Sequence, residues 1–155
     1  MCEIINEYAK TRRRIHSWLD SKKIPSNDNI VGRIGEYYAI VYFKQQFPDL
    51  SIIPTSTTNQ ADYDFCIGSE KYSVKTITKE NKAGSTTPIK FNENWNYLVA
   101  IKLDDNFNLA SLSVIDYPSL KKALDANSLK QGRVPGIKKS FRWWKILNEH
   151  IYRKV

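Results

Sequence analysis

The sequence predicts one α/β domain in which helices flank a mixed central sheet of about four or five strands. Apolar residues recur at helical spacing over residues 3–21 and 30–47, and two pairs of strand-like runs follow over 62–76 and 97–115. No internal repeat or low-complexity tract interrupts this order. The length of 155 residues suits a single domain that buries its own core.

The first 29 residues are expected to form a basic helix and a loop. The apolar positions of this helix, from Glu3 to about Ser21, are Ile4, Ile5, Tyr8, Ile15, Trp18 and Leu19. Its exposed side is expected to carry Lys10, Arg12, Arg13 and Arg14. The polar stretch that ends at Asn29 then supplies an N-cap for a second helix, which Pro48 closes.

The runs Asp62–Ile67 and Tyr72–Thr76 predict an antiparallel hairpin. With Ser69 and Glu70 at the tip, Ile67 pairs with Tyr72 and Asp64 lies opposite Lys75. Because side chains alternate along a strand, one face is polar. This face carries Asp62, Asp64, Cys66, Ser73 and Lys75. The alternation fails after Lys75, so the regular strand is expected to end or twist there.

The remaining elements complete a core over residues 30–116 and a helical, basic segment over 117–155. A short strand is expected near 51–54, a pair of strands over 97–103 and 109–115, a helix opening at Tyr117 and a last helix over about 140–152.

Charge and cysteine content point to an intracellular protein that meets a polyanion. Twenty-four Lys and Arg against sixteen Asp and Glu give a net charge of +8, which makes nucleic acid the first partner to test. The unpaired spacing of Cys2 and Cys66 indicates neither a disulfide framework nor a zinc site. We expect a cytoplasmic location and no membrane partner, since no secretory signal or long apolar run is present. The sequence contains no glycine-rich phosphate-binding loop, so we expect no nucleotide cofactor.

Glu36 is the first candidate for chemistry. Small residues beside it let the helix approach the sheet closely, so its carboxylate needs a cation. That cation is either a basic side chain in an ordinary ion pair, from Arg33 or from elsewhere in the chain, or a divalent metal shared with Asp64. Mg²⁺ suits Glu36, Asp64 and a backbone carbonyl near Ser73 or Val74, and Mn²⁺ can substitute for it. The Lys75 ammonium is then placed to orient a nucleophile or neutralise a phosphate.

These residues resemble the core of the PD-(D/E)xK nuclease superfamily. The likeness covers about residues 30–77, through Glu36 in Gly32-Arg33-Ile34-Gly35-Glu36, Asp64 before Phe65-Cys66-Ile67, and Ser73-Val74-Lys75-Thr76. It implies a restriction-endonuclease-like fold, metal-binding roles for Glu36 and Asp64, and a catalytic role for Lys75.

Ser73 stands where the family usually carries an acidic or amide residue of the catalytic motif, and Tyr63 replaces the family's proline. A hydroxyl is a poorer Mg²⁺ ligand than a carboxylate. The acids that could substitute for it are Asp62, Glu80 and Glu93.

The resemblance implies a Mg²⁺-dependent DNA endonuclease, in its leading version a small type II restriction-like enzyme that cuts duplex DNA as a homodimer. The alternative is a weak or inactive nucleic-acid-binding module on the same fold, and behind it stands a basic interaction protein with ordinary ion pairs. The residues expected to touch nucleic acid are Arg12, Arg13, Arg14, Asn59, Gln60, Lys79, Lys82, Lys138, Lys139, Arg142 and Lys145.

Overall fold

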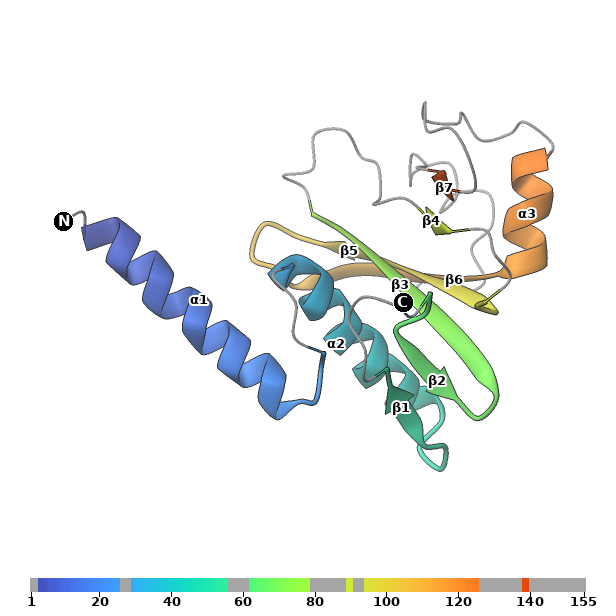
Figure 1. Cartoon of the computed structure of the whole chain (residues 1–155), viewed down its shortest axis with the longest axis horizontal. Helices are drawn as coiled ribbons and strands as arrows, with labels where there is room; N and C mark the ends of the chain where they lie inside the picture. The colour runs from blue at the N-terminus through green and yellow to red at the C-terminus, as the bar shows by residue number, and fades with distance from the viewer. Residues whose placement is uncertain are drawn as a thin grey trace.

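The computed structural model describes residues 3–25, 29–55, 62–78, 89–90, 94–125 and 138–139. Its helices are α1 (Glu3–Ser21), α2 (Ile30–Gln46) and α3 (Tyr117–Asp125). Its strands are β1 (Ile52–Pro54), β2 (Phe65–Ile67), β3 (Glu70–Thr78), β4 (Ile89–Lys90), β5 (Tyr97–Leu103), β6 (Leu109–Asp116) and β7 (Lys138–Lys139). Figure 1 shows α2 along the sheet, with α1 extending away from it.

Five strands form a mixed sheet in the order β1-β2-β3-β5-β6, and β4 and β7 form a separate two-stranded ribbon. Only the central pair, β3 and β5, is parallel among the paired strands that the structure describes. The predicted mixed α/β class is therefore confirmed, as are the strand near residues 51–54 and the β5–β6 hairpin.

Opposite faces of the sheet support two clusters of buried residues. Along β5, Val99 and Ile101 belong to the core beneath α2, whereas Leu98 packs with Trp95 and Leu120 on the α3 side. This division follows from the alternation of side chains along a strand. Apolar side chains thus pack on both faces of the sheet. A polar site is therefore expected at the ends or edges of the sheet.

Helix α2 comes unusually close to β3 at Gly35. A Cβ atom at this position would lie 1.8 Å from Thr76 Oγ1 and 2.9 Å from Thr76 Cβ, so only glycine fits without movement. The prediction that a small residue brings this helix onto the sheet is thus supported at Gly35. At Gly32 the added atom would instead meet the side chain of Asn29, the residue that caps the helix by accepting from the Gly32 N–H at 3.0 Å.

The hairpin forms, but its predicted register was wrong by two residues. Gly68 and Ser69 make the turn, so that Ile67 pairs with Glu70 and Phe65 with Tyr72. Gly68 has a φ of +60°, which glycine adopts without strain and which suits the first position of a tight hairpin turn. A slip of two residues keeps every side chain on its face, so the polar face survives.

Of the two expectations for the strand after Lys75, an end or a twist, the end was wrong, because β3 continues to Thr78. Pairing with β5 extends through Thr78 and Leu103, and this pairing holds the strand regular. The loss of polar and apolar alternation after Lys75 has a local cause. Thr76 lies under the glycine of α2, and Ile77 packs with Ala100 on the opposite face.

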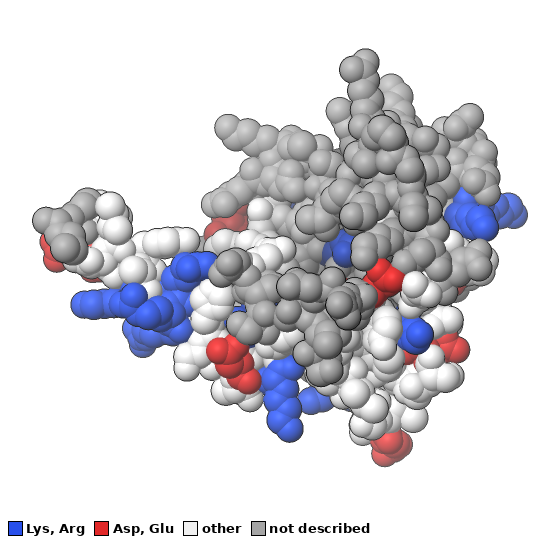
Figure 2. Space-filling model, viewed as in Figure 1, with Lys and Arg blue, Asp and Glu red and all other residues white. Residues whose placement is uncertain are grey.

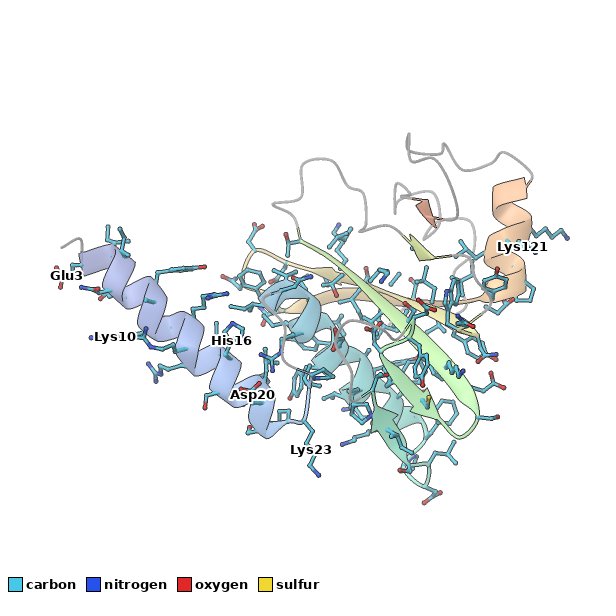
Figure 3. All side chains as sticks on the ribbon, in the orientation of Figure 1. Glu3, Lys10, His16, Asp20, Lys23 and Lys121 are labelled. Atoms are coloured by element: carbon cyan, nitrogen blue, oxygen red, sulfur yellow. The ribbon has the colours of Figure 1, made fainter. Side chains whose placement is uncertain are left out.

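The helix predicted over residues 3–21 is confirmed, but most of its apolar side is not buried. Leu19 is fully buried, whereas Ile4 and Tyr8 are 74% and 66% exposed. The attachment of α1 to α2 is both apolar and polar. Leu19 joins the core, and the ring centroids of Trp18 and Tyr37 lie 4.6 Å apart. Arg33 of α2 contacts His16 Nδ1 at 2.8 Å, Asp20 Oδ1 at 2.5 Å and the Ile24 carbonyl at 2.9 Å. His16 and Asp20 lie on the side of α1 that faces the body of the molecule (Figure 3).

The C-terminal segment agrees with the sequence at its start and differs from it at residues 138–139. Helix α3 begins at Tyr117, where the Asp116 side chain accepts from the Ser119 N–H at 2.9 Å. Lys138 and Lys139 form β7 opposite β4, and neither strand was predicted. The helix expected over about 140–152 lies outside the described residues. Among the described helices, none combines the length and apolar composition that a membrane crossing requires.

Candidate active site at the open edge of β3

The candidate site lies where β2 stops short of β3. Pairing between these strands ends at Phe65 and Tyr72, although β3 continues to Thr78. In the part of the chain that the structure describes, no strand covers the stretch from Lys75 to Thr78 on that side. The edge of the sheet is therefore open at the position where polar side chains from two elements converge.

Asp64 is fixed at this opening by both its backbone and its side chain. Its N–H donates to the Tyr72 carbonyl at 2.8 Å, and its carbonyl accepts from the Thr55 N–H at 2.9 Å. Its Oδ2 accepts from the Val74 N–H at 2.5 Å. The carboxylate thus replaces the missing strand as an acceptor for β3, which locks its position.

The register places Ser73, not Lys75, beside Asp64. Burial raises the pKa of Asp64 above its usual value. The Lys75 ammonium, and then hydrogen bonds with the Val74 N–H and the Ser73 side chain, lower this pKa without offsetting the effect of burial. Ser73 is itself buried, so its hydroxyl serves the neighbouring carboxylate.

Glu36 reaches the same cluster from α2. It follows Gly35, the point of closest approach to β3. Burial, and then the nearby Asp64, raise the pKa of Glu36 from 4.5 to about 8, while Arg33 and Lys75 act in the opposite direction. Glu36, Asp64 and Lys75 therefore share one electrostatic environment, which the sequence had suggested.

Arg33 does not form the simple ion pair with Glu36 that was the alternative. Its guanidinium is fully buried and contacts His16, Asp20 and the Ile24 carbonyl of the α1 region. Its charge moderates the pKa of Glu36 without bringing it back to the usual range. The sequence offered no signal for these partners, because they lie 9 to 17 residues away.

The donor set fits a divalent cation. Two carboxyl groups with raised pKa values lie beside a single ammonium, so the cluster can accept further positive charge. Mg²⁺ is commonly held by one or two carboxylates, with water completing its shell. Within the described residues, no group of three or more His, Cys, Asp or Glu side chains is positioned for a metal ion. The structure thus offers two protein carboxylates, Glu36 and Asp64.

The substitute acids are less well placed or lie outside the described residues. Asp62 Oδ2 accepts from Asn94 Nδ2 at 2.8 Å, at the surface. Glu80 and Glu93 fall outside the described residues, so their part in the site stays a prediction.

Of the residues expected to touch nucleic acid, the Arg12–Arg14 cluster is described in full. These side chains lie on α1, where Figure 2 shows Lys and Arg gathered along the helix. Lys138 and Lys139 form β7. The others lie outside the described residues, namely Asn59, Gln60, Lys79, Lys82, Arg142 and Lys145.

Comparison with known protein families gives no match for this chain, and comparison with curated proteins gives no relative. Function is therefore inferred from the residues of the site.

Proposed function

We propose that the protein is a metal-dependent DNA endonuclease that hydrolyses phosphodiester bonds, of the small restriction-like kind. The observation that carries the proposal is the cluster at the open edge of β3, where two carboxyl groups of raised pKa lie beside Lys75. Perturbed carboxyl pairs next to a lysine are typical of functional sites. The likeness to the PD-(D/E)xK superfamily stays a prediction that this cluster supports.

Each residue of the cluster has a separate part in this proposal. Glu36 and Asp64 would hold Mg²⁺, or Mn²⁺ in its place, which when bound supplies an activated water and charge neutralisation at the phosphate. Asp64 is kept in position by the Val74 N–H. The Lys75 ammonium, close enough to lower the pKa of both carboxyl groups, would orient the attacking water or neutralise a phosphate oxygen.

The charge of the molecule supports a nucleic-acid substrate. The net charge of +8 attracts a polyanion over long range, and phosphates bind Lys and Arg with a marked salt dependence. Arg13 and Arg14 are exposed on α1, which extends from the sheet in Figure 1. Duplex DNA and a homodimer, in which each site cuts one strand, complete the proposal.

Cleavage of supercoiled plasmid with and without Mg²⁺ or Mn²⁺ tests the activity. Lys75→Ala and Asp64→Asn should abolish nicking while DNA binding, measured by gel shift, persists. Lys71→Ala is the matched control: Lys71 lies on the same strand with its amine 5.0 Å from the Tyr63 ring centroid, and its loss should leave cleavage intact. Cleavage that survives Lys75→Ala, or that needs no divalent cation, would contradict the proposal.

A nucleic-acid-binding module without cleavage is the second candidate, because Ser73 occupies the position of the usual acid and bonds to Asp64. It predicts salt-sensitive DNA retention with no nicks under either metal. The plasmid and gel-shift assays together separate the two candidates.

A further inference from the structure

A cavity lies at the end of α2 that is farther from Glu36. It has a volume of about 430 Å³ and opens between the last turns of this helix and the strands β3, β5 and β6. This volume falls within the usual range of small-molecule sites, roughly 300–1,000 Å³. Its lining includes Phe43, Phe47, Tyr72, Tyr97 and Asp116.

The cavity is separate from the carboxylate cluster. Glu36 lies in the first half of α2, whereas Phe43 and Phe47 lie 7 and 11 residues further along. At 1.5 Å per residue, this spacing is roughly 10 to 17 Å along the helix axis. A ligand in the cavity therefore has its own recognition chemistry.

Aromatic rings cross the sheet as a stack that ends at the cavity. Phe65 and Tyr72 stack with centroids 5.0 Å apart at 4°, and Tyr72 and Tyr97 stack 5.0 Å apart at 18°. Each ring comes from the next strand of the sheet. On the following strand, the residue paired with Tyr97 is Asp116. The row of side chains across the sheet thus consists of three aromatic rings followed by the Asp116 carboxylate. A planar group that stacks on Tyr97 would lie next to this carboxylate.

The charge of the lining selects the kind of planar group. The described lining contains Asp116 and no Lys or Arg, in a chain of net charge +8. Burial, and then Tyr97 and Glu70, raise the pKa of Tyr72 to about 12, which keeps this phenol neutral. Neutral aromatic faces attract cations, and a carboxylate repels phosphate.

We propose that this cavity binds a guanidinium group carried on an aliphatic stem, as in an arginine side chain or a free arginine derivative. The guanidinium stacks on Tyr97 and pairs with the Asp116 carboxylate, and the stem packs on Phe43 and Phe47. A guanidinium is planar, permanently charged and able to bond a carboxylate through two N–H groups, whereas an ammonium lacks the plane. Asp116 keeps acceptor capacity for this role, because its cap to Ser119 uses one of about four acceptor positions.

Isothermal titration with N-acetyl-arginine methylamide, on the full chain without DNA or metal, tests this site. Saturable binding is expected, and the citrulline analogue, which keeps the shape and loses the charge, should bind at least about tenfold more weakly. The lysine analogue should also be weaker. Because neither nucleic acid nor metal is present, failure of this experiment is independent of failure of the nuclease proposal.

Variants locate the binding. Asp116→Asn keeps a good N-cap for α3 and removes the charge, so affinity for the arginine probe should fall at least about tenfold with the fold unchanged by circular dichroism. Tyr97→Leu should weaken binding, and Tyr97→Phe should largely preserve it. Asp104→Asn, in the β5–β6 turn, is the control and should bind as the wild type does.

Two further arms define the ligand. A Gly-Arg-Gly peptide that binds more tightly than the amino-acid probe identifies a protein segment as the source, and equal or weaker binding identifies a free metabolite. The proposal is overturned if citrulline binds as well as arginine, if Asp116→Asn has no effect, or if guanosine monophosphate is the preferred ligand.

Discussion

The raised pKa of Glu36 makes the candidate site a measurable source of pH-dependent instability. An acid that binds its proton more tightly in the folded state favours folding at low pH, so the free energy of unfolding falls as pH rises through this interval. For Glu36 the interval runs from 4.5 to about 8. At about 1.36 kcal/mol per pH unit this amounts to roughly 5 kcal/mol in total and roughly 3 kcal/mol at pH 7.

Glu36→Gln removes the titrating group while keeping its size, so the variant should lose less stability than the wild type between about pH 4.5 and pH 9. Urea unfolding at several pH values in EDTA measures the difference, with Glu70→Gln as a control carboxylate at the other end of β3. Millimolar Mg²⁺ at pH 8 should then stabilise the wild type more than Glu36→Gln, because the metal favours the ionised form. Parallel pH profiles for the two proteins would refute the assignment of a buried, protonated Glu36.

Three other substitutions probe the frame of the site. Gly35→Ala should destabilise the protein by about 1–3 kcal/mol in urea unfolding, because the new methyl group meets Thr76; an unchanged midpoint would contradict the close approach. Arg33→Met should cost about 1–3 kcal/mol and speed proteolysis after α1, since it removes the part-buried contacts to His16 and Asp20 and the buried contact to the Ile24 carbonyl; unchanged protease sensitivity would oppose this role. Ser73→Glu should lower stability in EDTA by a few kcal/mol and recover it with Mn²⁺, because a third buried carboxylate needs a cation; no metal-dependent recovery would place Ser73 outside the metal site.

The local features of the fold could be predicted from the sequence because they depend on residues that are close together in the chain. The spacing of Ile, Leu and aromatic residues predicted α1 and α2, and the turn after Leu103 predicted the β5–β6 hairpin. An N-cap from the polar stretch before Ile30 was an equally local prediction, and Asn29 is the residue that supplies it.

The hairpin slip was a local error, because the turn was placed at Ser69 and Glu70 although Gly68 has the backbone freedom that the turn uses. Features set by distant contacts could not be predicted from the sequence. The exposure of Ile4 and Tyr8 on α1 depends on what covers the helix, and helical spacing does not report that. The pairing of β4 with β7, and the partners of Arg33, likewise join segments far apart in sequence.

The residues of the candidate site could be predicted from the sequence, but their arrangement could not. The reason is that side chains alternate between the two faces of a strand. Asp64 and Lys75 were expected to face each other, whereas Asp64 pairs its carboxylate with the backbone of Val74 and with Ser73. The two-residue slip left all three side chains on one face, so the cluster survived the error. The sequence did not indicate that β2 begins only at Phe65, which leaves the edge of β3 away from β5 open from Lys75 to Thr78 in the described part of the chain and allows Glu36 on α2 to act on the same charges. The candidate site thus depends on this missing strand pairing as much as on the residues themselves. A β2 that began before Asp62 and paired with Lys75 would close the site even with every candidate side chain in place.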